Sequence, residues 1–223
     1  FIATEIPYAY DVSVKSDHDI ISISLGEDYA VISHAEENKI GVYQKFNNCI
    51  YQETFVELQE NTENNIYYLI LNQRGNGFIK EQFDNKEEGI CALGIYAVSI
   101  LGERIRDIET QDKILELEDN EIKSLNKLLD LKIGENYFSI FKEKKISVNL
   151  EQTKNGLYNI FYMTPDFKKV YLIKDREAPS AFLVLYNFSL KLKEVISLLN
   201  LWKNDFNISM QFEEKIRRLI LGK

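Results

Sequence analysis

Apolar residues in the first part of the chain come in short runs or alternate with polar residues. Runs of this kind, about four to eight residues long and bounded by Gly, Asn or Asp, are typical of β-strands. They predict strands at Ile20–Leu25, Tyr29–Ser33, Ile40–Phe46, Ile50–Leu58, Ile66–Leu71 and Phe78–Phe83. Gly75-Asn76-Gly77 separates the last two strands and predicts a hairpin turn, because Gly and Asn tolerate positive φ.

Helical spacing replaces the strand pattern after these runs. Apolar residues recur every three or four positions and predict a helix from Lys86 to Arg106, which Asp84 or Asn85 can cap. Three glycines inside this helix lower its intrinsic propensity by about 1 kcal/mol each relative to Ala. They would let its backbone approach a neighbouring sheet closely.

The second part of the chain again contains strands followed by helices. Its patterns predict a strand at Ile114–Leu117, a helix from Asp119 to Leu131, strands at Tyr137–Phe141, Ile146–Leu150, Leu157–Met163 and Val170–Lys174, and helices at Ser180–Trp202 and Ile208–Leu221. Ala181–Tyr186 can also be interpreted as a strand, because an unbroken apolar run does not define a period.

Together these elements predict an α+β fold of two similar lobes, each a mainly antiparallel sheet backed by helix. No Pro-rich or Ser-rich linker divides the chain, and the charged stretch Arg104–Glu121 is the best boundary. We therefore expect an N-terminal lobe of residues 1–110 and a C-terminal lobe of residues 111–223, joined as one compact unit.

Self-comparison indicates an internal duplication. Three segments recur in the same order: Leu25–Tyr29 as Ile133–Tyr137, Asn65–Leu69 as Asn159–Met163, and Phe78–Glu81 as Leu172–Asp175. A duplication predicts that residues 20–83 and 132–175 form like antiparallel sheets, with Gly26 and Gly134 in equivalent turns. The alternative is that two antiparallel lobes reuse the same turn residues.

The first copy, Ile20–Gly26 followed by Tyr29–Ile32 and Lys39–Val42, resembles the opening hairpin of actin-like ATPase domains. The expected order of strand, strand, helix and strand from Tyr67 to Leu117 is similar to that of cytoplasmic scaffold domains in pilus and type II secretion assembly. The resemblance implies an actin-like domain within such a membrane-associated complex.

The sequence departs from this family at the position that matters for nucleotide binding. Active members place an acidic residue two positions before the hairpin glycine, where it organises the metal and phosphates. Ser24 and Lys132 occupy those positions here, and no Gly-rich adenosine motif follows. The resemblance therefore implies a degenerate member that acts as a scaffold without nucleotide.

Composition narrows the classes of partner. The net charge of −8 argues against nucleic acid, because affinity for its backbone comes from clustered Lys and Arg. Apolar stretches end short of the roughly 18 residues that a membrane helix needs, and no signal-peptide pattern follows Phe1. Cys49 and Cys91 lie far apart without metal-ligand spacing, which is typical of free thiols in a reducing compartment. We predict a cytoplasmic protein with no membrane span and no cofactor.

No catalytic, cofactor or metal-binding residues can be assigned from motifs. Ser16–Asp19 contains an Asp-His-Asp sequence, but lacks recognisable metal partners and is typical of a polar turn. His34 lies beside two glutamates at a predicted strand end and reads as a solvated histidine. The acidic run Glu116–Glu121 can bind a cation weakly, yet such runs are usually solvated helix starts.

The last predicted helix has an apolar stripe that suits protein binding. The stripe consists of Phe212, Ile216, Leu219 and Ile220, and basic residues crowd the final turns. One interpretation is a helix packed on its own core. The other is a stripe that docks on a partner or leads toward a membrane.

The sequence thus predicts a non-enzymatic interaction protein or assembly scaffold with a protein partner. Two other classes stay open: an acidic inhibitor or immunity-type protein that masks a basic enzyme, and an enzyme whose carboxylates come together from distant residues. A single acidic face would favour the inhibitor. A deep pocket with convergent carboxylates would favour the enzyme.

Overall fold

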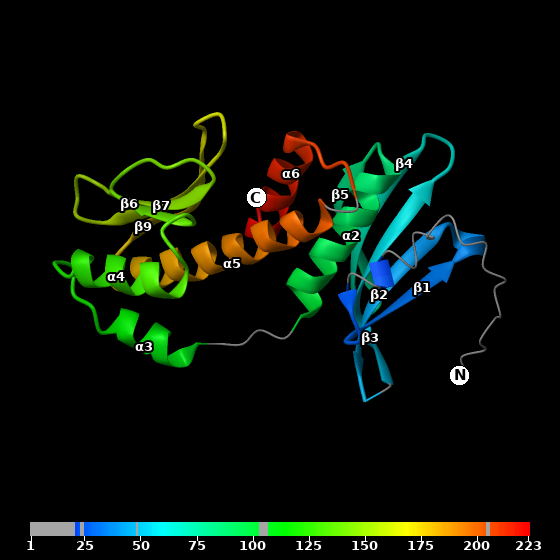
Figure 1. Cartoon of the computed structure of the whole chain (residues 1–223), viewed down its shortest axis with the longest axis horizontal. Coiled ribbons are helices and arrows are strands. Elements are labelled where there is room, and N and C mark those ends of the chain that lie inside the picture. Colours follow the sequence, from blue (N-terminus) through cyan, green and yellow to red (C-terminus); the bar gives the residue numbers. More distant parts are fainter. Residues whose placement is uncertain (1–20, 23–24, 48, 103–106, 204–205) are drawn as a thin grey trace. The chain divides into compact units, whose positions relative to one another are not determined.

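The computed structural model describes residues 21–22, 25–47, 49–102, 107–203 and 206–223 (Figure 1). The chain divides into two compact units, Phe1–Ala97 and Val98–Lys223. The division falls inside helix α2 (Lys86–Leu101), ahead of the boundary expected within the charged stretch. Much of that stretch is helix α3 (Ile108–Leu115), which packs against α5 (Ser180–Trp202) and so belongs to the second unit.

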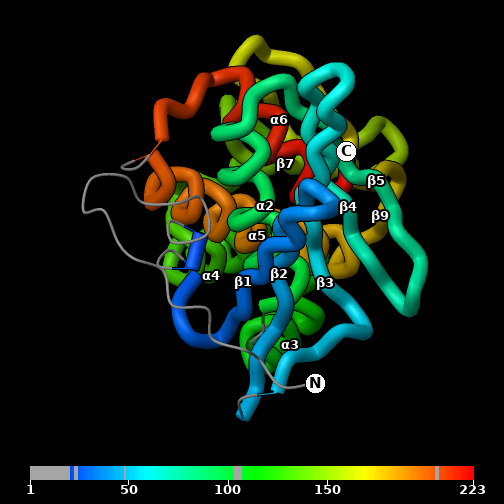
Figure 2. Tube along the Cα trace, turned by 90° about the vertical axis from the view of Figure 1, so that its right-hand side faces the viewer, coloured from blue at the N-terminus to red at the C-terminus, as the bar shows by residue number. Residues whose placement is uncertain are grey.

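Unit 1 contains a five-stranded antiparallel meander in the order β1-β2-β3-β4-β5, and Figure 2 shows its first strands running side by side. The strands are β1 (Tyr29–His34), β2 (Lys39–Phe46), β3 (Cys49–Asn61), β4 (Ile66–Gln73) and β5 (Asn76–Phe83), with the 3-10 turn η1 (Ala35–Glu37) after β1. Register places Val42 opposite Val56, and Val56 opposite Leu71, so buried side chains line one face across three strands.

Two details of unit 1 confirm predictions made from local residues. Asn85 caps α2, because its Oδ1 accepts from the N–H of Glu87 at 2.8 Å. Gly89 gives the predicted close approach: a Cβ at this position would lie 3.2 Å from Leu58 and from Cβ of Tyr67. Helix α2 therefore lies directly on the buried face of β3 and β4.

The β4–β5 hairpin is confirmed, but its turn lies one residue earlier than expected. Gln73 pairs with Asn76, so Arg74 and Gly75 form the two-residue loop, with φ of 50° and 78°. Positive φ at both central residues is the type I′ geometry that matches the twist of a hairpin.

The strand predicted at Ile20–Leu25 is wrong where the chain is described. Ile21, Ser22 and Leu25 are helical, and the N–H of Gly26 donates to the Ser22 carbonyl at 3.2 Å. Ile21 and Leu25 are both buried. A spacing of four residues places them on one helical face. The same run also alternates apolar and polar residues, so it fits the period of a strand as well.

Unit 2 places a four-stranded sheet and several helices around α5. It contains α3, α4 (Ile122–Lys132), β6 (Phe138–Ile140), β7 (Ser147–Gln152), β8 (Tyr158–Met163), β9 (Lys169–Arg176), α5 and α6 (Met210–Leu221). The strand order is β6-β7-β8-β9, and β6 runs parallel to β7 while the other pairs are antiparallel. Helix α5 packs along β7, β8 and β9, and it also contacts α3 and α6 (Figure 1). The α+β class with two lobes is therefore shown.

The strand predicted at Ile114–Leu117 is wrong, because Ile114 and Leu115 close helix α3. Thr110 and Ile114 are buried on the same side of this helix, four residues apart. The strand that ends the element order in the actin-like resemblance is therefore missing. Ala181–Tyr186, which also suited a strand, begins helix α5.

The two units share part of the predicted duplication. Gly26 and Gly134 both follow helical residues and precede a strand, with φ of 75° and 97°. An antiparallel hairpin followed by a helix also recurs, as β4–β5–α2 and β8–β9–α5. The prediction of like antiparallel sheets is wrong, because unit 2 has four strands and a parallel pair where unit 1 has five antiparallel strands.

Asp107 generates a prediction about acid stability. Its carboxylate accepts from the N–H of Thr110 at 3.0 Å and from Thr110 Oγ1 at 2.7 Å, and Lys132 Nζ lies 3.0 Å away. The hydrogen bonds from Thr110, followed by that from Lys132, lower the pKa of Asp107 from 3.8 to about 2. A depressed pKa stabilises the fold above the ordinary value, and this contribution is lost as pH falls through the folded value.

We expect the free energy of unfolding to fall between pH 4 and pH 2, and Asp107→Asn to reduce this dependence. Asn retains a capping oxygen but carries no charge to titrate. Denaturant unfolding across this pH range measures the effect, with Asp112→Asn on the same helix as control. An unchanged pH dependence in Asp107→Asn would contradict the assignment.

Candidate functional site

The apolar stripe of the last helix lies inside unit 2. Phe212, Ile216 and Ile220 are at most 3% exposed, Leu219 is half-buried, and α6 packs against α5. These side chains fill the core between the two helices. Their placement favours the packing interpretation of the stripe over the docking interpretation.

Truncation of Ile216 should therefore lower stability. Ile216→Ala removes buried methyl groups and leaves a cavity, at an expected cost of about 2–5 kcal/mol in the free energy of unfolding. Leu219→Ala on the half-buried edge of the same helix should cost clearly less. Denaturant unfolding measures both. Equal stability of Ile216→Ala and the unmodified protein would restore the docking interpretation.

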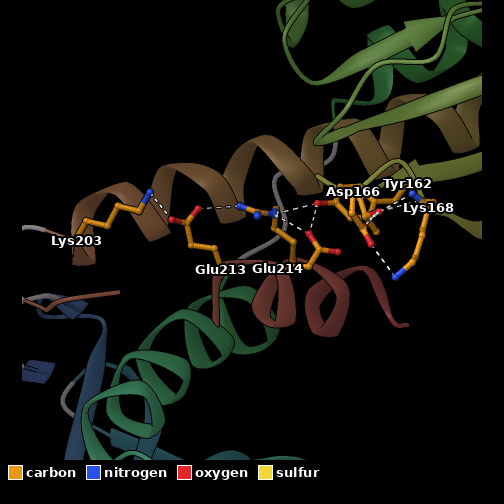
Figure 3. A network of polar contacts seen from close by, with 8 residues as sticks. Tyr162, Asp166, Lys168, Lys203, Glu213 and Glu214 are labelled. Carbon is orange, nitrogen blue, oxygen red and sulfur yellow. Dashed lines mark hydrogen bonds and ion pairs between the residues drawn. The ribbon is translucent and has the colours of Figure 1, made fainter. Parts of the chain in front are cut away.

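A second set of candidate groups is the polar network around Arg217, whose side chain is only 4% exposed. Arg217 donates from Nη1 to Glu213 at 3.0 Å and from Nε to the Tyr162 hydroxyl at 3.0 Å. Tyr162 in turn donates to Glu214 at 2.7 Å, and Lys203 Nζ lies 2.6 Å from Glu213 (Figure 3). The network thus joins α6 to β8 and to the end of α5.

The electrostatics of this network suit a structural role. Burial by itself would raise the pKa of Glu213, but hydrogen bonds from Lys203 and Arg217 outweigh it and lower that pKa. Burial, followed by the effect of Glu214, raises the pKa of Tyr162 far above its usual value, despite an opposing contribution from Arg217. The Glu213 carboxylate therefore keeps its charge beside two cations, and the Tyr162 phenol keeps its proton.

Arg217→Met should destabilise unit 2 strongly. It leaves the mostly buried carboxylate of Glu214 without its cation and that of Glu213 with Lys203 alone. Removing one partner of a buried ion pair costs about 3–5 kcal/mol. The neighbouring residue gives a matched control, because Arg218 is exposed and Arg218→Met should change stability little. Thermal and denaturant unfolding compare them, and equal losses in both variants would argue against a special role for Arg217.

An open groove lies elsewhere in unit 2, between α4 and the end of β6. Two pockets of about 350 Å³ each adjoin here and share Ile122 and Phe141 as lining residues. We call them together the α4–β6 groove. Its lining residues are Glu118, Asp119, Asn120, Ile122, Lys123, Asn126, Lys127, Ile140, Phe141, Gln152 and Tyr158.

Phe141 lies at the centre of the groove because of its backbone conformation. Its φ of 59° is unusual for a bulky residue and interrupts the alternation of side chains along β6. Phe141 therefore lines the groove together with its neighbour Ile140. Its ring stacks near Tyr158, with ring centroids 6.4 Å apart and planes at 16°, and half of it remains exposed.

The two ends of the groove differ in charge. At one end the Tyr158 hydroxyl donates to Asp119 and accepts from Gln152 Nε2 at 3.3 Å. Burial and then Asp119 raise the pKa of Tyr158 far above its usual value, so the phenol keeps the proton that orients Asp119. Glu118 lines the same end, and its carboxylate has no hydrogen bond or ion pair among the described residues. Lys123 and Lys127 line the other end.

The β6 strand gives the groove an open backbone edge. It is the first strand of its sheet, and its register with β7 uses the peptide groups of residues 137, 139 and 141. The N–H and C=O of Phe138 and Ile140 therefore point away from β7. No hydrogen bond between these groups and another described part of the backbone is present. A second chain could pair with this edge.

The other candidate residues are not brought together. Ser16–Asp19 and Ser24 lie outside the described residues, His34 ends β1, and Lys132 pairs with Asp107 at 3.0 Å. In the described part of the chain, no cluster of His, Cys, Asp or Glu could hold a metal ion. Of the described cysteines, Cys49 is exposed and Cys91 is buried, and neither forms a disulfide.

Only part of the groove corresponds to a sequence feature. Glu118 and Asp119 belong to the acidic run Glu116–Glu121, whose pattern is typical of a solvated helix start. No sequence motif includes the other lining residues Phe141, Gln152 and Tyr158. The residues next to Phe141 do not predict its positive φ. Their grouping depends on the pairing of β7 with β8 and on the turn after β6.

Comparison with known proteins does not assign this chain to a family. Neither a protein-family model, nor a curated protein, nor a solved structure matches this chain. No helix among the described residues is both long and apolar enough to cross a bilayer.

Proposed function

We propose that this chain is a non-enzymatic protein-interaction module that binds an extended segment of a partner in the α4–β6 groove. The observation that carries the proposal is the open edge of β6 directly beside a groove with apolar walls. An extended peptide can add to such an edge as a further strand, with backbone hydrogen bonds for affinity and side-chain pockets for specificity. A helix beside the edge supplies the second wall.

The walls of the groove supply the contacts that protein interfaces use. Ile122, Ile140 and Phe141 provide apolar surface, and the half-exposed ring of Phe141 is rigid and large. Aromatic side chains of this kind carry much of the binding energy at interfaces. Carboxylates line one end of the groove and lysines the other, which suits a segment bound in one orientation. The inhibitor alternative would instead require one uniform acidic face. The groove thus supports segment binding over the inhibitor alternative.

An assembly scaffold is one form of this proposal, and the actin-like resemblance stays a prediction that favours it. A cytoplasmic location and association with a membrane-bound complex also stay predictions. The mostly buried carboxylates of Glu213 and Glu214 are already paired with cations around Arg217. That pairing supports a binding role over the enzyme alternative.

Phe141→Ala tests the proposal with Phe167→Ala as its matched control. Both phenylalanines are in unit 2 with positive φ, of 59° and 62°, and both are about half exposed, at 50% and 59%. Only Phe141 lines the groove. Peptides selected on the unmodified protein from a random phage-displayed library should bind Phe141→Ala at least about tenfold more weakly and Phe167→Ala unchanged.

Hydrogen exchange gives the structural readout for the same peptides. Strand addition should protect the amide of Ile140, which points away from β7. Melting temperatures of both variants check that the fold is retained. If no peptide can be selected, or if selected peptides bind Phe141→Ala normally and leave Ile140 unprotected, the proposed function is wrong.

A further inference from the structure

We infer that the segment bound in the α4–β6 groove carries a lysine or arginine side chain, which enters the acidic end of the groove. This inference rests on the proposed function and specifies the chemistry of the partner. Four residues form the receiving end, which we call the acidic cup: Glu118, Asp119, Phe141 and Tyr158. The cup combines a cavity, two carboxylates and two aromatic rings.

The cavity and the rings suit the shape of a basic side chain. The pocket at this end has a volume of about 350 Å³, which accommodates one long side chain. Phe141 and Tyr158 are nearly parallel, with planes at 16°, and Phe141 is half exposed. An ammonium or guanidinium group is attracted to the face of such a ring, and the aliphatic stem of Lys or Arg packs against apolar surface.

The carboxylates give the cup its preference for a cation. Glu118 has no cationic partner among the described residues, in contrast to Glu213, which is paired with Lys203 and Arg217. Asp119 accepts one hydrogen bond, from a phenol that keeps its proton, and this bond directs the carboxylate without neutralising it. An incoming cation would gain charge-assisted hydrogen bonds here. An acidic residue would meet like charge and be rejected.

The lysines at the opposite end orient the segment. Lys123 and Lys127 lie one helical turn apart on α4, on the same side of the helix. A cation in this half of the groove would be repelled, while a neutral or acidic residue would be accepted. The basic residue of the segment should therefore occupy one fixed position, with the rest of the segment running toward Lys127.

Peptide selection on three proteins tests the inference. Peptides selected from the random library on the unmodified full chain should carry Lys or Arg at one position. Selection on Glu118→Gln should show this preference much more weakly, because Asp119 is then the only carboxylate of the cup. Glu116→Gln changes the net charge equally but lies outside the groove, and should keep it. A preference that persists equally in Glu118→Gln reflects general attraction to an acidic protein and overturns the inference.

A titration with the best selected peptide quantifies the contact. Replacing its conserved basic residue by norleucine, which keeps the apolar stem, should weaken binding about tenfold at low salt and less at high salt. Replacing it by Glu should weaken binding further. The same norleucine substitution should weaken binding to Glu118→Gln clearly less, because one of the two carboxylates of the cup is gone.

The outcomes separate the two proposals. Peptides that protect the Ile140 amide and need Phe141, but that show no basic position, would leave the proposed function standing and overturn the cation inference. Selected peptides that bind without protecting Ile140 and without needing Phe141 would overturn both.

Discussion

Helix α5 buries side chains along its whole length, from Ala181 to Trp202, and helices α3 and α6 and strands β7, β8 and β9 pack against it. Its apolar residues recur every three or four positions, so the stripe stays on the sides that meet the sheet, α3 and α6. Since β7, β8 and β9 all rest on α5, β7 keeps a fixed position. The edge strand β6 pairs with β7, and the α4–β6 groove takes its shape from that pairing.

Unit 2 contains two kinds of carboxylate: those that the fold pairs with a cation and those that it leaves unpaired. Glu213 and Glu214 are mostly removed from solvent, so they require Arg217 and Lys203 nearby to offset the cost of desolvation. Glu118 keeps its contact with water and needs no cation for folding. It is therefore free to pair with a cation from outside.

The two units share part of their order of elements but differ in how their first strands pair. Both units use a glycine in the left-handed region after helical residues, and both end a hairpin in a helix. The chain after β1 returns as an antiparallel strand, whereas the chain after β6 crosses over and pairs in parallel. Positive φ at Phe141 and Ile146 and the bonds of the Asn149 side chain to Lys144 hold this crossover. The same crossover creates the α4–β6 groove of unit 2.

Local periodicity by itself determined most of the strands and helices and the α+β class. Alternation fixes which side of a strand faces the core, and a spacing of three or four residues does the same for a helix. The pattern failed where a short run fits both periods, as at Ile21–Leu25 and at Ile114. Tertiary structure alone decided that β6 pairs in parallel, that Ile216 is covered by α5, and that Phe141 stays exposed beside Tyr158. These features depend on contacts between residues far apart in the chain, and local sequence does not encode which apolar surfaces are covered and which remain open for a partner.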